Sequence, residues 1–170
     1  SLIMLNVGDN MTDAGQAASD LTGIMRGFKM AAGDAIPILD RINEVANNSP
    51  IGFDKLTEGL TRSAGVMQQA GTSIDQTIGL LTGGFAQLRN IEKVSTGLNT
   101  ISSRLRGLSE DGEAIDGLAP KLKKAFKEVA NIDIEDSEGQ LRGLFDILED
   151  YSKVYDTLST KQREYLSQLA

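Results

Sequence analysis

The sequence predicts an all-α protein, an irregular multi-helix bundle of about seven or eight helices joined by short loops. Apolar residues recur at spacings of three and four along nearly the whole chain, which is the period of a helix with one buried face. Aromatic residues make up only 5% of the chain and tryptophan is absent, so the core must consist of Leu, Ile, Val, Met and Ala. Only residues 131–136, where Ile132 and Ile134 alternate with polar residues, predict a short extended link.

The first three helices are predicted from their apolar faces and from the helix-breaking residues between them. The first is expected to begin near Asn10 or Thr12. The second should follow Gly33 with Asp34 as its N-cap, and it carries the predicted apolar face Ile36, Leu39, Ile42 and Val45. The third is predicted from about Phe53 to Gln69.

Later helix starts are marked by a Ser-x-x-Gln pattern, which is typical of a capping box. The three examples are Ser73 with Gln76, Ser137 with Gln140, and Ser159 with Gln162. The pair Gly83-Gly84 should kink or end the helix that begins at Ser73, because helical glycine costs about 1 kcal/mol relative to alanine. A further helix is predicted over Leu118 to Ala130.

The most regular pattern in the chain is a narrow apolar stripe over residues 91–108. Its members are Ile91, Val94, Leu98, Ile101, Leu105 and Leu108. As one helix it would extend about 27 Å at 1.5 Å per residue. We predict that this stripe serves helix packing or self-association, and the sequence leaves both readings open.

Domain organisation is predicted from composition. Residues 1–108 should form an N-terminal helical bundle, 109–117 an acidic, glycine-containing hinge, and 118–170 a C-terminal helical subdomain. One continuous domain is the alternative. Because the chain opens on Ser1 and a helical pattern still runs at Ala170, we expect a fragment of a longer protein.

Glycine is unusually frequent inside the predicted helices. The seven positions are Gly15, Gly23, Gly27, Gly59, Gly65, Gly79 and Gly97. Close helix packing is the favoured interpretation, since glycine lets two backbones approach, and deliberate pliability is the alternative.

The sequence predicts no enzyme, no cofactor and no metal site. Cysteine and histidine are both absent, which removes thiolate nucleophiles, Cys/His metal sites and the usual proton shuttle at neutral pH. No glycine-rich phosphate loop occurs. The segment Asp133–Gly139 resembles a calcium loop, but its glycine comes one position late and Leu144 stands where the bidentate acid belongs.

Charge and hydropathy argue against nucleic acid and membrane as partners. The net charge of −7 disfavours attraction to phosphate backbones. The one basic cluster, formed by Lys121, Lys123, Lys124 and Lys127, is interpreted as the solvated face of a helix. No apolar run approaches the roughly 18 residues that span a bilayer.

Several segments in the same order resemble the core region of phage tail tape measure proteins. They are "DLTGIMRGFKM", "AIPILDRINEVANNSPIGFDKLTEGLTRSAGVMQQAGTSIDQTIGLLTG", "VSTGLNTISSRLRG" (residues 94–107) and "NIDIEDSEGQLRGLFDILEDYSKVYDTLSTKQREYLSQLA". The resemblance covers about residues 11–170. The stretch "LTGGFAQLRNIEKVSTG" departs from it by being richer in glycine, which bears on the geometry of the predicted kink.

The resemblance implies a non-enzymatic structural segment of a phage or prophage tail, contributing to tail assembly and length determination. It also implies tail tube protein and tail assembly chaperones as partners, and a place in the virion tail after assembly in the bacterial host cytoplasm. Two other classes remain as alternatives on the residues alone. They are a stand-alone helical interaction module of a bacterial secretion or signalling system, and a lytic enzyme domain.

Overall fold

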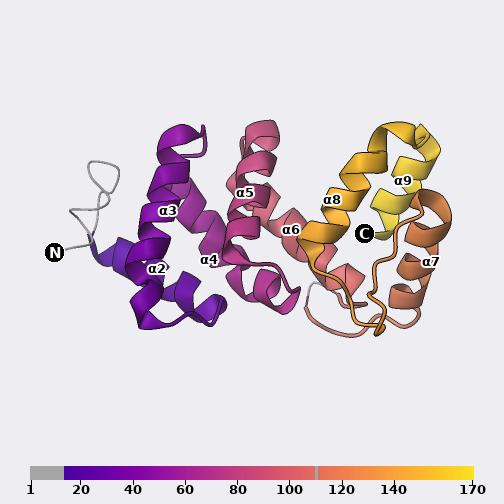
Figure 1. Ribbon diagram of the computed structural model, residues 1–170, viewed down its shortest axis with the longest axis horizontal. Coiled ribbons are helices and arrows are strands. Elements are labelled where there is room, and N and C mark those ends of the chain that lie inside the picture. The colour runs from indigo at the N-terminus through magenta and orange to yellow at the C-terminus, as the bar shows by residue number, and fades with distance from the viewer. Residues whose placement is uncertain (1–13, 110) are drawn as a thin grey trace. The chain divides into compact units, whose positions relative to one another are not determined.

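The computed structural model describes residues 14–109 and 111–170, and within these ranges the chain is helical with no strand (Figure 1). This confirms the predicted all-α fold. The described helices are α2 (Ala14–Gly27), η2 (Ala32–Asp34), α3 (Ala35–Asn48), α4 (Phe53–Gln69), α5 (Ile74–Leu88), α6 (Ile91–Leu105), α7 (Leu118–Ala130), α8 (Leu144–Val154), η3 (Tyr155–Thr157) and α9 (Thr160–Leu169). The predicted start near Asn10 or Thr12 lies outside the described residues.

The chain forms two compact units that share helix α6 along the sequence. Unit 1 comprises, as far as it is described, residues 14–69 and 73–97, and unit 2 comprises residues 70–72 and 98–170 apart from residue 110. The change from one unit to the other therefore falls inside α6. The predicted boundaries, with a hinge at 109–117, stay a prediction.

Unit 1 is built around α4, which packs against α2, α3 and α5. Its most deeply buried side chains are Ile24, Ile42, Leu56, Leu60, Met67 and Leu81. The approach of α2 to α4 is very close, because a Cβ added at Gly27 would lie 2.4 Å from the Cβ of Ala64. Glycine at position 27 is thus a requirement of this packing.

The helical glycines differ in how closely their neighbours approach. Gly27 and Gly59 face a tightly packed neighbour, as close packing requires. At Gly65, Gly79 and Gly97, by contrast, an added Cβ would meet no packed atom of the described chain within 4 Å. For these three positions the interpretation as close-packing residues is wrong, because open space surrounds the missing side chain.

The start of α3 corrects two details of the prediction. Asp34 precedes the helix, but its Oδ2 accepts a hydrogen bond from the Ala31 N–H at 3.0 Å and makes no side-chain cap on α3. Ile36 is 51% exposed, and Ile38 is buried in its place. The two residues are about 200° apart around the helix, so only one of them can lie on its buried face.

Two of the three predicted capping boxes are confirmed. Ser73 caps α5 and Ser159 caps α9, each with the glutamine three residues later. The box at Ser137 is wrong, since α8 begins only at Leu144. The side chain of Asp136 instead accepts hydrogen bonds from the N–H groups of Glu138 and Gln140, both at 2.9 Å, and this holds the segment in a turn.

The glycine pair at 83 and 84 does not end α5, which continues to Leu88, so the expected early end is wrong. Backbone hydrogen bonds close the predicted hinge segment, residues 109–117, into a loop. Leu108 and Ala114 form an isolated antiparallel bridge, and Ile115 N–H donates to Gly107 O at 2.7 Å.

In unit 2 the predicted extended link at 131–136 follows α7, and both of its isoleucines are buried. Arg142 ties this link to α8. Its Nη1 donates to the Asp133 carbonyl at 2.6 Å and its Nη2 to the Asp150 carboxylate at 2.7 Å. The hydrogen bond from Arg142, helped by Lys153, lowers the pKa of the Asp150 carboxyl.

Candidate interaction site

Helix α6 carries the stripe that the sequence singled out, and its ends are set by local hydrogen bonds. Asn90 Oδ1 accepts from the Lys93 N–H at 2.8 Å and caps the start of the helix. At the other end, Leu108 N–H donates to Ser103 O at 2.9 Å across Gly107, whose φ is +75°. This Schellman arrangement ends the helix at Leu105. Leu108 therefore lies beyond the helix, and the predicted single helix over residues 91–108 is too long.

The first half of the stripe is packed within unit 1. A Cβ at Gly59 would lie 2.7 Å from Ile91 Cδ1, and one at Gly84 would lie 2.7 Å from Val94 Cγ1. Glycines of α4 and α5 thus make room for the first two stripe residues. Because both contacts are already at the limit of close approach, this half leaves no space for another group.

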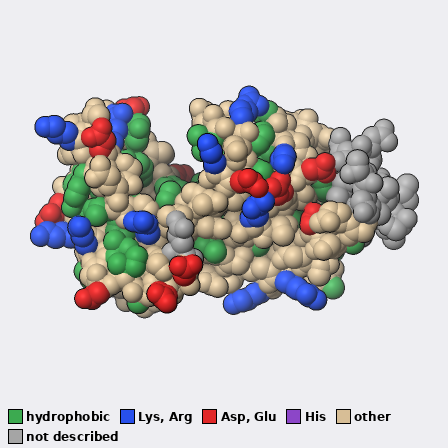
Figure 2. All heavy atoms as spheres, turned by 180° about the vertical axis from the view of Figure 1, so that it is seen from behind, with side chains coloured by type: hydrophobic (Ala, Val, Ile, Leu, Met, Phe, Trp, Pro, Cys, Tyr) green, Lys and Arg blue, Asp and Glu red, His purple; other side chains and the backbone are tan. Residues whose placement is uncertain are grey.

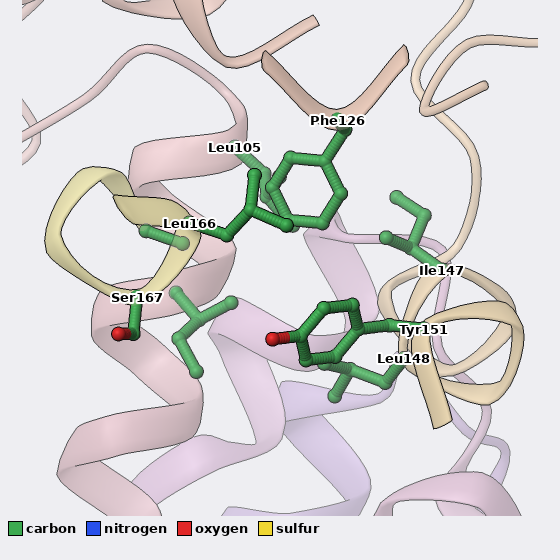
Figure 3. Close-up of a pocket in the computed structure, with 9 residues that line it drawn as sticks. Leu105, Phe126, Ile147, Leu148, Tyr151, Leu166 and Ser167 are labelled. Carbon is green, nitrogen blue, oxygen red and sulfur yellow. The ribbon is translucent and has the colours of Figure 1, made fainter. Parts of the chain in front are cut away.

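The second half of the stripe belongs to unit 2, where Ile101 and Leu105 line an apolar cavity of about 150 Å³ (Figure 3). Four helices contribute to its wall. The lining residues are Ile101 and Leu105 of α6, Phe126 of α7, Ile147, Leu148 and Tyr151 of α8, and Leu166, Ser167 and Ala170 at the C-terminal end. The structure thus brings two stripe residues together with seven that the sequence reasoning did not connect to them.

Aromatic contacts set the shape of this cavity. The rings of Phe126 and Tyr151 meet edge to face, with centroids 6.2 Å apart, and Tyr151 meets Tyr155 in the same way at 5.6 Å. The Arg163 guanidinium lies over the Tyr155 ring, 4.1 Å from its centroid. Figure 3 shows the Tyr151 ring extending from α8 toward the side of the cavity formed by α9. Burial raises the pKa of the Tyr151 hydroxyl.

The cavity wall offers little for catalysis. It has no acidic side chain, and the hydroxyl of Ser167 donates along its own helix to the Arg163 carbonyl at 2.9 Å. Across the described ranges, no group of three or more acidic residues could hold a metal ion. None of the helices described is long and apolar enough to cross a membrane.

A second hollow, of about 410 Å³, lies in unit 1 beside α2 and the start of α3. Its lining consists of Ala18, Leu21, Thr22, Met25, Arg26, Met30, Ala32 and Ala35. It is mostly apolar, and Arg26 is the one charged residue in this wall.

The basic cluster on α7 faces acidic partners. Lys127 pairs with Asp133 at 2.7 Å, and Lys123 pairs with Glu135. On the face drawn in Figure 2, basic and acidic side chains are interspersed. Two carboxylates of the loop that resembles a calcium site, Asp133 and Glu135, are therefore paired with lysines.

Fold and hollows together define an all-helical protein with apolar hollows in both of its units. A family model described as phage-related minor tail protein matches residues 1–170. The chain belongs to that family and is a protein of phage tails. No solved structure matches it. The phage tail part of the resemblance is thereby confirmed.

Proposed function

We propose that this chain is a non-enzymatic structural segment of a tape measure protein, acting in tail assembly and in the determination of tail length. The match of the tail family over residues 1–170 is the observation that carries the proposal. The assignment to a tape measure protein is supported by the resemblance of the segments quoted above. The chief one is "VSTGLNTISSRLRG", which forms the last three turns of α6 and its terminating Gly107.

The structure supports a scaffold in two respects. A helix rises by a fixed amount of about 1.5 Å per residue, so the number of residues in a helical chain can set a length. The hollows in both units are lined mainly by apolar side chains, and such surfaces serve packing against other chains better than they serve chemistry.

Tail tube protein and tail assembly chaperones are the partners we propose, and self-association through the stripe is a further one. The place of action is the virion tail, after assembly in the host cytoplasm.

The test changes the length of this segment in the phage that encodes it. As one continuous helix, 170 residues would extend about 255 Å. An in-frame deletion of codons 14–170 should shorten the tails uniformly by up to about 235 Å, and a tandem duplication should lengthen them. Tail length is measured by electron microscopy of negatively stained particles.

A control variant separates length from folding. Leu105→Asp disturbs the core of unit 2 without changing the number of residues, so any tails that form should keep wild-type length. If the deletion prevents tail formation, the duplication decides, because it keeps every residue. Tails of unchanged length in the duplication phage would contradict the tape measure role.

A further inference from the structure

The cavity of unit 2 has the size and wall of a small-molecule site. We propose that it binds one monocyclic apolar molecule of benzene size. This inference concerns the free chain and goes beyond the tail role proposed above, so either one can fail without the other.

The volume selects the size of the ligand. Apolar cavities of about 150 Å³ lined by Leu, Ile and Phe stay dry and accept benzene. The cavity here has about the same volume and the same kinds of wall residue. It is too small for a nucleotide or another large cofactor, since such sites usually measure about 300 Å³ or more.

The wall excludes water as the preferred occupant. A buried water needs two to four polar partners. The inner wall is formed by the buried side chains of Leu105, Phe126, Ile147 and Leu166, which offer none. An apolar ring placed there would instead contact aliphatic groups and two aromatic side chains.

The mouth gives such a molecule a way in. Ile101, Leu148, Tyr151 and Ala170 are only half-buried, and Ser167 is exposed. The cavity therefore reaches the surface of unit 2 on this side, and a small ring can enter without unfolding of a helix. Figure 3 shows Leu166 and Tyr151 extending toward each other across this space, which places their side chains where a bound ring would touch both.

The experiment is a titration of the full 170-residue chain with benzene, followed by methyl NMR of Ile and Leu residues. We expect saturable shifts of the methyl signals of Leu105, Ile147 and Leu166. Signals of Ile24 and Leu60 in the core of unit 1 should stay in place, and they serve as the internal reference.

A filled cavity is the matched control. Ala170→Leu adds side-chain volume at the cavity wall and should abolish the saturable shifts. Gln168→Leu adds an apolar side chain at an exposed position of α9 outside the wall, and it should leave binding intact. The proposal is overturned if benzene causes no saturable shift in the wild-type chain, or if Ala170→Leu binds benzene as well as Gln168→Leu does.

Discussion

The two units differ in how closely their helices pack. In unit 1, helices approach so closely that an added Cβ at Gly27, Gly59 or Gly84 would overlap a neighbouring atom. In unit 2, Phe126 and Tyr151 meet edge to face and the surrounding helices leave a cavity of about 150 Å³. An added methyl group would therefore clash at the glycine contacts of unit 1, whereas the cavity of unit 2 has room for one.

The stripe on helix α6 includes both close packing and loose packing. Ile91 and Ile101 are the same residue type in the same predicted pattern. Ile91 is buried against the backbone of Gly59, whereas Ile101 lines the cavity and is only half-buried. A regular periodicity thus identifies a buried face, but the residues opposite decide how tightly that face is packed.

The largest effect is expected from a charge placed in the wall of the unit 2 cavity. Leu105 is 3% exposed, and Leu105→Asp would bury a carboxylate without a partner. The free energy of unfolding should fall by about 4 kcal/mol. Urea unfolding followed by circular dichroism measures the loss, and hydrogen exchange shows whether it is confined to unit 2.

The matched control for this variant is Leu88→Asp, because Leu88 is 59% exposed at the end of α5. The loss there should stay under about 1 kcal/mol, most of it from a negative charge near a helix C-terminus. Equal small losses in both variants would mean that Leu105 is not buried in the monomer and that the stripe serves self-association instead.

Smaller changes in stability, of opposite sign at two glycines, test the packing of unit 1. Gly27→Ala should destabilise the chain by about 1–3 kcal/mol, because the new methyl group would overlap Ala64. Gly65→Ala, at an open and exposed helical position, should stabilise it by up to about 1 kcal/mol. Thermal unfolding of both variants measures the two shifts. Stabilisation by Gly27→Ala would show that α2 and α4 are not in close contact.

Much of the fold could be predicted from local patterns. The bounds of α4 and α7 agree with the predicted helices, because apolar periodicity and breaking residues act within a few positions. The end of α6 was missed because Gly107 terminates the helix while the apolar spacing continues to Leu108. The capping box at Ser137 fails because a neighbouring side chain takes its place. The Asp136 side chain accepts the hydrogen bonds of the backbone that Ser137 would have capped.

The candidate site was predictable only in part. Ile101 and Leu105 were in the stripe, but the rest of the cavity wall comes from three other helices. Which face of α7, α8 or α9 meets α6 depends on tertiary packing, and no spacing along the chain records it. The sparse aromatic residues were the one available signal, because Phe126 and Tyr151 both lie on apolar helix faces.

The smallest effects come from the caps, and here the two units should behave alike. Ser73→Ala in unit 1 and Ser159→Ala in unit 2 should each cost about 1 kcal/mol, because each removes the acceptor for a backbone N–H in the first turn. Ser73 should cost slightly more, since its bond from Gln76 N–H is 3.2 Å long and the matching bond at Ser159 is 3.4 Å. Ser137→Ala should change nothing measurable, because Asp136 holds that turn. Thermal unfolding of the three variants decides the matter, and an equal loss at Ser137 would show that its capping box forms in solution.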